Sequence, residues 1–195
     1  GAAEIRACGG EALSLAHNVA EEVDWRRVID ATLERFGGLN ILVNNAGIAF
    51  AAGLEDTTTE QWRGIMAVNV DGVFFGCKAA LPAMRESGGG AIVNISSIAG
   101  LRHIGNDHVG YSAAKAGLVQ FGRALAVKYA PLGIRCNSIS PGLMHTPLVE
   151  VRLAAQYGAG NAAALIEKRN KQVPMGHMGE GWDVAYAAIY LASDE

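Results

Sequence analysis

Short apolar runs bounded by turn residues alternate along the chain with longer segments that have helical periodicity. The runs lie at about 12–16, 40–44, 91–96 and 134–139. Apolar stretches of this length between turn signals are typical of buried strands. Strands that alternate with helices predict a parallel sheet covered by helices, so we expect an α/β fold.

Three of the helical segments have clear signals. In the first, apolar residues from Trp25 to Phe36 follow the helical period, and Gly37-Gly38 closes the segment. The second opens with a capping-box pattern at 57–60 and places an apolar stripe, which includes Asn69, along residues 62–84. The third runs from about Tyr111 to Tyr129 and stops before a Pro-Leu-Gly turn. All three are expected to pack on the sheet.

The segment after the last predicted strand is less regular. Residues 148–171 have an Ala-rich helical pattern that is interrupted at 157–160. Such an insertion is longer than a simple strand-to-helix connection, and insertions at strand ends often form lids. We therefore predict one domain over 1–195, with a lid or substrate-loop insertion at about 143–180.

The amino-acid composition argues against several functional classes for this protein. The 195 residues include 16 Lys or Arg and 19 Asp or Glu, a net charge of −3 without a basic cluster, which argues against a nucleic-acid partner. No apolar run reaches the roughly 20 residues of a membrane-spanning helix, so no membrane partner is expected. Cys8, Cys77 and Cys136 are far apart and lack CxxC spacing, which predicts neither a disulfide framework nor a metal site and favours the reducing cytoplasm.

Polar residues follow three of the predicted strands at the point where each strand ends. Asn44 to Gly47 follow the strand near 42, Ser96 and Ser97 follow the strand near 93, and Pro141-Gly142 follow the strand near 137. Ligands of open parallel sheets bind in the crevice beyond the carboxyl ends of the strands. We expect these three segments to open on one crevice.

Tyr111 and Lys115 have the i, i+4 spacing that places two side chains on one face of a helix. A phenol with its ordinary pKa of about 10 exchanges protons poorly at neutral pH. An ammonium roughly 6 Å away, at an effective dielectric constant of about 20, stabilises the phenolate by about 3 kcal/mol. The spacing alone also fits an ordinary amphipathic helix with a solvated Lys. If the two groups act together, we expect Lys115 to lower the pKa of Tyr111 and to make it an acid or base.

The order of these motifs resembles the short-chain dehydrogenase/reductase family. The resemblance rests on Asn44 to Gly47, Asn94 to Ser97, Tyr111 with Lys115, and Pro141-Gly142, and it extends to Asn69 to Gly72 and Pro174 to Gly176. It implies a Rossmann-like doubly wound parallel sheet, here truncated at both ends. It also implies an NAD(P)-dependent oxidoreductase that interconverts an alcohol and a ketone or aldehyde by hydride transfer with Tyr acid/base catalysis.

The resemblance assigns the catalytic site to Asn69, Ser97, Tyr111 and Lys115. Tyr111 would exchange the proton of the substrate oxygen, Ser97 would hold that oxygen, Lys115 would lower the pKa of Tyr111, and Asn69 would position a water. Asn69 lies on an apolar stripe, so burial without a hydrogen-bond partner would cost about 1 to 3 kcal/mol.

The cofactor is expected to be NAD or NADP. The resemblance places Asn18 and Val19 at the adenine, Asn45, Ala46 and Gly47 beside the adenosine ribose, Pro141, Gly142, Met144 and Thr146 at the nicotinamide carboxamide, and Tyr111 and Lys115 at the other ribose. The substrate is expected to be a small alcohol or carbonyl compound that contacts Ser97, His103, Tyr111, Leu143 and Leu148. A hydrolase triad of Ser97, Asp107 and a neighbouring His lacks a GxSxG elbow and is not favoured.

A glycine-rich phosphate-binding turn of the GxGxxG type is absent from residues 1–195. The resemblance implies that this turn and the strand that selects NAD or NADP would precede Gly1, and that a last strand would follow Glu195. We therefore expect this chain by itself to fold poorly and to bind no cofactor.

The alternative function is a noncatalytic Rossmann-like binding or scaffold protein, or an inactive fragment. The resemblance also implies a homo-oligomer, either a tetramer or a dimer, that is joined through the helices near 60–85 and 111–130.

Overall fold

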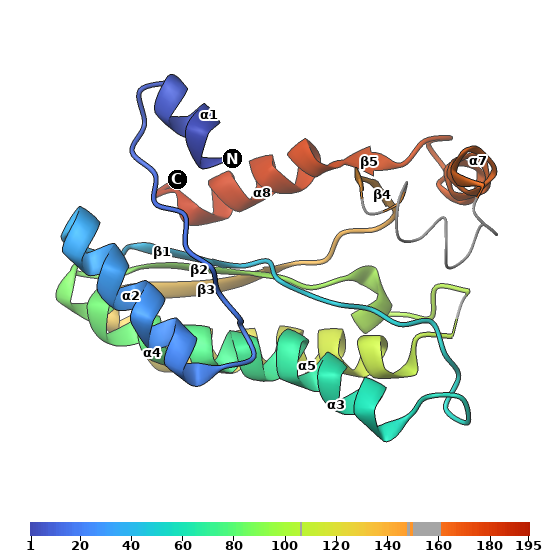
Figure 1. The fold of residues 1–195 in the computed structure, drawn as a ribbon, viewed down its shortest axis with the longest axis horizontal. Helices are drawn as coiled ribbons and strands as arrows, with labels where there is room; N and C mark the ends of the chain where they lie inside the picture. Colours follow the sequence, from blue (N-terminus) through green and yellow to red (C-terminus); the bar gives the residue numbers. More distant parts are fainter. Residues whose placement is uncertain (106, 148, 150–160) are drawn as a thin grey trace.

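A parallel sheet forms the centre of the protein (Figure 1). The computed structural model describes residues 1–105, 107–147, 149 and 161–195. Strands β1 (Ile41–Asn44), β2 (Gly90–Ile95) and β3 (Ile134–Ile139) are adjacent in that order and all run parallel. The predicted α/β class is confirmed. Two short strands, β4 (Met144–His145) and β5 (Gly179–Glu180), pair in parallel at one end of the sheet.

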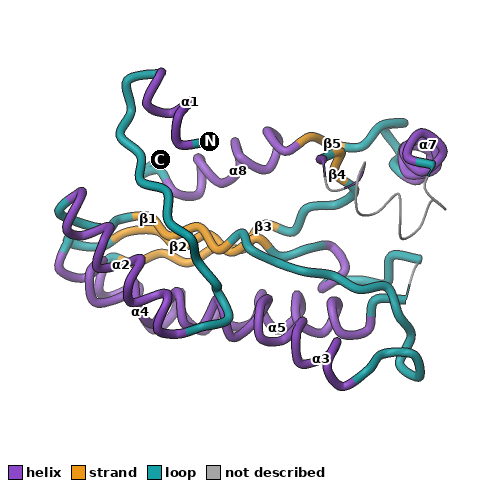
Figure 2. Tube along the Cα trace, in the orientation of Figure 1, coloured by secondary structure: helices purple, strands orange, loops and turns teal. Residues whose placement is uncertain are grey.

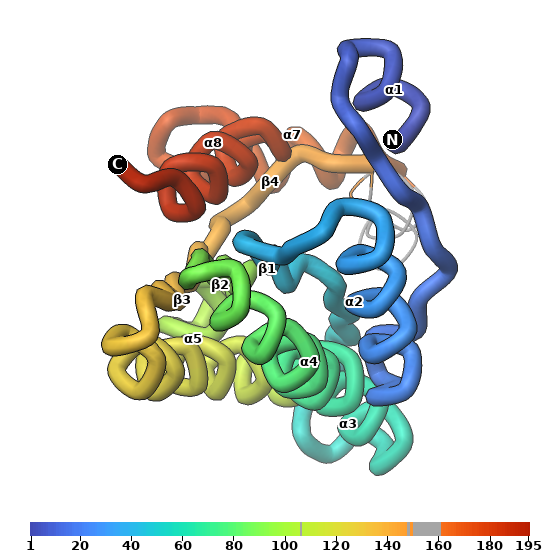
Figure 3. Tube along the Cα trace, turned by 90° about the vertical axis from the view of Figure 1, so that its left-hand side faces the viewer, coloured from blue at the N-terminus to red at the C-terminus, as the bar shows by residue number. Residues whose placement is uncertain are grey.

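Helices cover both faces of the sheet, as Figure 2 shows in purple around the orange strands. One layer contains α2 (Glu22–Phe36), α3 (Thr59–Met66), α4 (Gly72–Glu86) and α5 (Val109–Tyr129). The opposite face carries α8 (Gly181–Ala192), while α1 (Ala2–Ala7) projects away from the sheet (Figure 3). Among the described residues there are also a π-helical turn, η1 (Ala67–Asp71), the 3-10 turns η2 (Ile98–Gly100) and η3 (Ala130–Leu132), and α7 (Ala162–Gln172) beyond the ends of the strands.

The core lies between the sheet and the layer of α2, α4 and α5. The stripe predicted along 62–84 supplies Val73, Cys77, Leu81 and Met84, which are all buried. They pack in one cluster with Trp25, Ile29, Leu42, Ile92, Leu118, Ile134 and Cys136. The helix that runs over Thr59–Glu86 is long and apolar enough to meet the length and composition of a membrane span. Its buried apolar side chains from Val73 to Met84 belong to this core, as expected for a central helix of a globular fold.

A row of buried amides crosses the sheet. Asn44 and Asn94 are register partners on β1 and β2, and Asn44 Nδ2 donates to Asn94 Oδ1 at 2.9 Å. Asn94 Nδ2 in turn lies 3.6 Å from Sγ of Cys136 on β3. Asn44 is 5 % and Asn94 0 % exposed, so their mutual hydrogen bond offsets part of the cost of burying the two amides. Asn44 Oδ1 has no hydrogen-bond partner among the described residues.

The strand predicted at 12–16 does not form. Residues 11–18 run alongside the sheet without strand pairing and then turn into α2. Leu13 and Leu15 are 43 % and 37 % exposed, because no described strand lies beside this segment to complete a ladder. An apolar run alone could not reveal that its hydrogen-bonding neighbour is missing.

Candidate active site

A cavity of about 390 Å³ opens beyond the carboxyl ends of β2 and β3. Its wall is built from the ends of these strands, the first turn of α5, the segment around β4 and one face of α7. The described lining residues are Ala49, Ile95, Ser96, Ser97, Ile98, Ile104, His108, Tyr111, Pro141, Gly142, Leu143, Met144, Thr146, Val149, Leu165, Lys168, Arg169 and Gln172. The predicted crevice exists at the ends of β2 and β3. The expectation that the segment after β1 opens on the same crevice is wrong, because Asn44, Asn45 and Ala46 line a smaller, separate cavity.

Ser97 and Tyr111 form a hydroxyl pair on the wall of this cavity. Ser97 caps η2, where its Oγ accepts a hydrogen bond from the Ala99 amide at 3.1 Å. Tyr111 lies in the first turn of α5 and is half-buried. Burial raises the pKa of Tyr111 above its ordinary value, and a side-chain hydrogen bond with Ser97 opposes that rise. The phenol is therefore protonated at neutral pH.

Lys115 lies one turn further along α5 with its ammonium buried under the same wall. The side chain is 4 % exposed, and Nζ donates to the Ile95 carbonyl at 2.7 Å. Nζ also lies 5.7 Å from the centre of the Tyr111 ring, close to the separation expected from the sequence. Burial lowers the pKa of Lys115 to about 8.

The net pKa of Tyr111 is raised in this chain, whereas the sequence argument predicts that it is lowered. Burial is the largest influence on both groups, and it raises the pKa of the phenol while it lowers that of the ammonium. The sequence argument counted the attraction between ammonium and phenolate but not the cost of removing both charges from water.

Ser96, the residue before Ser97, has a different environment. Ser96 is 3 % exposed and its Oγ donates to the Lys115 carbonyl at 2.9 Å, so it ties β2 to α5. We expect Ser97→Ala to lower kcat/KM by about 10²-fold with little change in stability, because it removes a donor beside the reacting oxygen. Ser96→Ala is expected to cost about 1 kcal/mol of stability. Kinetics and urea unfolding of both variants test the assignment, and a larger loss of turnover in Ser96→Ala would reverse it.

Asn69 lies in a π-helical turn, η1 (Ala67–Asp71), between α3 and α4. Its side chain is 0 % exposed, and Nδ2 donates to the carbonyls of Ile48 at 2.8 Å and Ile65 at 3.0 Å. Its Oδ1 has no hydrogen-bond partner among the described residues. A Cβ on Gly47 would lie 2.8 Å from this oxygen and 3.5 Å from Lys115 Nζ, so Gly47, Asn69 and Lys115 meet behind the hydroxyl pair.

The predicted cofactor residues fall into two neighbouring groups. Pro141, Gly142, Met144 and Thr146 line the main cavity together with Tyr111. Val19, Asn45 and Ala46 line a second cavity of about 200 Å³ beside Trp25. Gly47, which follows Ala46, connects this second group to the Asn69 and Lys115 side chains.

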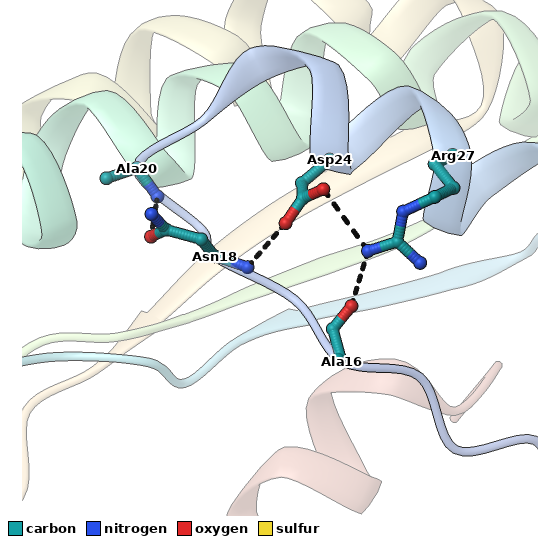
Figure 4. A network of polar contacts seen from close by, with 5 residues as sticks. All are labelled: Ala16, Asn18, Ala20, Asp24 and Arg27. Carbon is teal, nitrogen blue, oxygen red and sulfur yellow. Dashed lines mark hydrogen bonds and ion pairs between the residues drawn. The ribbon is translucent and has the colours of Figure 1, made fainter.

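Asn18 is engaged in its own turn rather than in either cavity (Figure 4). Its Oδ1 accepts from the Ala20 amide at 3.2 Å, and its backbone amide donates to Asp24 Oδ2 at 2.8 Å. Asp24 also pairs with Arg27, which donates to the Ala16 carbonyl. The network fixes the entry into α2 and places Val19, but not the Asn18 side chain, at the second cavity.

The predicted substrate residues are only partly brought together. Leu143 lines the cavity with Ser97 and Tyr111, whereas His103 is exposed and does not line it. Leu148 lies outside the described residues.

His108 lines the cavity in place of His103, and its Nδ1 lies 3.2 Å from the Phe50 carbonyl. The position could have been found from the i, i+3 spacing that places His108 on the face of Tyr111. The cavity is also lined by Leu165, Lys168, Arg169 and Gln172 of α7, which fall in the predicted lid or substrate-loop segment at about 143–180 but were not singled out there. Within the described ranges, no three His, Cys, Asp or Glu side chains group as a metal site would require.

Comparisons with known proteins agree with this architecture. A family model described as enoyl-(acyl carrier protein) reductase matches residues 1–195. The chain is 38 % identical over 193 residues to the 2,5-dichloro-2,5-cyclohexadiene-1,4-diol dehydrogenase LinX of Sphingobium indicum, covering 99 % of this chain and 73 % of that protein. It is 39 % identical over 183 residues to the NADP-dependent (R)-specific alcohol dehydrogenase of Lentilactobacillus kefiri, covering 92 % and 69 %. The crystal structure of levodione reductase superposes with a TM-score of 0.92 at 35 % identity, covering 99 % and 75 %.

Fold and crevice thus define an α/β protein of the Rossmann-like class with a Ser, Tyr and Lys set at the carboxyl end of its sheet. The chain belongs to the short-chain dehydrogenase/reductase family, and its dehydrogenase relatives identify it as an NAD(P)-dependent oxidoreductase that acts on CH–OH groups.

Proposed function

We propose that this protein interconverts a secondary alcohol and a ketone, or a primary alcohol and an aldehyde, with Tyr111 as the acid/base. The observation that carries the proposal is the Ser97 and Tyr111 hydroxyl pair on the cavity wall, with the buried Lys115 ammonium 5.7 Å from the Tyr111 ring. The substrate oxygen would accept hydrogen bonds from both hydroxyls, which orients the carbonyl and polarises it.

Each side chain has a separate task in this proposal. In reduction, the protonated phenol of Tyr111 gives its proton to the carbonyl oxygen as the new C–H bond forms, and in oxidation the phenolate takes the proton of the alcohol. Ser97 holds the oxygen, and the Lys115 ammonium stabilises the phenolate that remains after reduction. A bound nicotinamide coenzyme supplies or accepts the hydride.

The residues present fit such a coenzyme. Gly47 leaves a backbone surface beside Asn69 Oδ1 and Lys115 Nζ, two buried groups that offer an acceptor and a donor. We assign Val19, Asn45, Ala46 and Gly47 to the adenosine half, and Pro141, Gly142, Met144 and Thr146 to the nicotinamide half. Lys115 would bind the ribose between them. Asn18 would contribute through the turn that it caps.

The assay that tests the proposal uses the purified protein at its full encoded length with NADH and NADPH and a panel of ketones and aldehydes. We expect coenzyme oxidation with at least one carbonyl compound, and coenzyme reduction with the corresponding alcohol. Coenzyme binding without turnover of any of them would favour the alternative of a noncatalytic binding or scaffold protein.

The pH dependence of kcat/KM should follow the protonation of the Lys115 amine. Because burial lowers its pKa to about 8, the ammonium is present below that pH and is lost above it. We expect kcat/KM for carbonyl reduction to be level near pH 6 to 7 and to fall as the pH rises through about 8. Lys115→Arg should move this falling limb to higher pH, since a guanidinium stays charged. An unchanged limb in that variant would show that another group controls it.

A second copy of the chain is the partner we propose for the outer face of α4 and α5. A cavity of about 290 Å³ on this face is lined by Phe74, Cys77, Lys78, Leu81, Pro82, Arg85, Phe121, Leu125 and Tyr129. Phe74 is 46 % exposed there, which leaves apolar surface that association would bury. Light scattering at full encoded length should show a dimer or tetramer, and a monomer would contradict this.

The free thiols of Cys8, Cys77 and Cys136 support a cytoplasmic location.

A further inference from the structure

Trp25 forms part of the wall of the second cavity, where the proposed function places the adenosine half of the coenzyme. The side chain is 8 % exposed and lies near the start of α2. Residues 1–195 contain three tryptophans, and neither Trp62 nor Trp182 lines this cavity. Trp25 is therefore the tryptophan whose substitution and fluorescence can report on this site.

The indole of Trp25 is hydrogen-bonded to the turn that borders the cavity. Its Nε1 donates to the Val19 carbonyl at 2.9 Å, and Val19 itself lines the cavity. A Cβ on Gly72 would lie 3.0 Å from the same carbonyl oxygen and 3.2 Å from Val19 Cγ2, so Val19 also packs on the first residue of α4. Two helices thus fix the position of Val19, one through a hydrogen bond and one through close contact.

Val19 is also the residue of this turn whose amide is left for a ligand. The Asn18 amide donates to Asp24 Oδ2 at 2.8 Å, and the Ala20 amide donates to Asn18 Oδ1 at 3.2 Å. The Val19 amide has no acceptor in the part of the chain that the structure describes. Backbone amides of this kind are among the few polar groups that orient a ligand in a cavity.

Packing from two sides holds the indole in one orientation. The His17 ring meets it edge-on, with 4.4 Å between the ring centroids and an angle of 88° between the planes. A Cβ on Gly76 would lie 2.8 Å from both Cζ2 and Cη2 of Trp25, so the indole lies directly on the backbone of α4. The direction of the Nε1–H bond toward Val19 is therefore set by the core and not by the turn.

We propose that Trp25 is a positioning residue for the coenzyme, because it holds Val19 in the place where the adenosine half binds. This rests on the proposed function, which assigns Val19 to that half. A buried indole N–H needs some acceptor, but here the acceptor belongs to the residue that lines the cavity and keeps an unpaired donor. Loss of the N–H leaves the Val19 carbonyl unpaired and the turn less fixed, which weakens adenosine binding without a change in proton transfer.

The first test measures the binding of ADP, which has the adenosine half without the nicotinamide, by calorimetry at full encoded length. Trp25→Phe keeps an aromatic ring and removes the N–H, and we expect its Kd for ADP to rise by about 10-fold. KM for the coenzyme should rise by a similar factor. At saturating coenzyme, kcat and KM for the carbonyl compound should stay at wild-type values.

Ile29→Ala is the matched control for this substitution. Ile29 lies on the same helix and in the same core cluster as Trp25, but it does not line the cavity. This variant should therefore be less stable than the wild type and should bind ADP with an unchanged Kd.

The second test leaves Trp25 in place and reads its fluorescence. In a protein whose other tryptophans are replaced by phenylalanine, ADP should change the emission of Trp25, because binding at Val19 alters the surroundings of the indole. ADP does not absorb at the emission wavelengths of tryptophan, so energy transfer does not contribute to the change.

Three results would overturn the role of Trp25. They are an unchanged Kd for ADP in Trp25→Phe, an equal weakening in Trp25→Phe and Ile29→Ala, and ADP that binds by calorimetry without any change in Trp25 emission. If ADP binding depends on Trp25 but no carbonyl compound is turned over, the role of Trp25 stands and the proposed function falls. If Trp25→Phe turns over carbonyl compounds with the wild-type KM for the coenzyme, the proposed function stands and the role of Trp25 falls.

Discussion

Tyr111→Phe is expected to lower kcat by about 10³-fold in both directions of the reaction, because it removes the only atom of this side chain that can exchange a proton. The ring itself is retained, so its packing beside His108 and over Lys115 should persist. Coenzyme binding and the free energy of unfolding should therefore change little. Steady-state kinetics, coenzyme titration by fluorescence and urea unfolding measure the three quantities on one sample.

Tyr129→Phe is the matched control for this substitution. Tyr129 lies at the other end of the same helix, α5, where its ring packs against the core rather than at the cavity. It should keep wild-type turnover. A Tyr111→Phe protein that retains most of its activity on every accepted substrate would remove Tyr111 from the chemistry.

Gly100→Ala is expected to destabilise the protein by about 3 kcal/mol or more, as overpacking against rigid backbone does. A Cβ on Gly100 would lie 2.6 Å from the Ala116 nitrogen and 2.6 Å from the Lys115 carbonyl carbon, so η2 or α5 must move. The same movement shifts Ser97, which caps η2, relative to Tyr111 of α5. Turnover should therefore fall at temperatures where the variant is still folded.

Gly117→Ala provides the control on α5. A Cβ at Gly117 meets no atom within 4 Å, and this position is exposed. Alanine is favoured over glycine inside a helix by about 1 kcal/mol, so this variant should be more stable than the wild type. Thermal and urea unfolding of both variants give the comparison. Equal stability of Gly100→Ala and the wild type would mean that η2 is not packed against α5 in solution.

Much of the fold could be predicted because its signals are local. The stripe along 62–84 marks the face of α4 that is buried, and the strand ends at Ser97 and Pro141 mark the crevice. The strand end at Asn44 marks the smaller neighbouring cavity. The Tyr111 and Lys115 pair could also be predicted, since helix geometry alone fixes an i, i+4 separation.

The misses concern properties that depend on distant neighbours. The run at 12–16 looks like a strand, but pairing requires an adjacent strand that the run itself does not encode. The pKa of Tyr111 depends on burial by several segments, which no spacing reports. Likewise, His108 lines the cavity and His103 does not because of the path of an irregular loop. Lys168 belongs to the site because α7 returns to it from beyond the sheet.

The hydrogen-bonded amides of Asn44 and Asn94 also fix the register of β1 against β2, on which the geometry of the crevice depends. If β1 slipped along β2 by one residue, every side chain of β1 would change faces, and both amides would be buried without each other at about 1 to 3 kcal/mol each. A shifted register therefore costs free energy of folding close to the site, because Asn44 lies one residue before Asn45 and Asn94 two residues before Ser96. In the alignment that pairs the two amides, the segment after β1 that we assign to the coenzyme and the segment after β2 that contains Ser97 leave the sheet side by side, so correct folding and assembly of the proposed site depend on the same pairing.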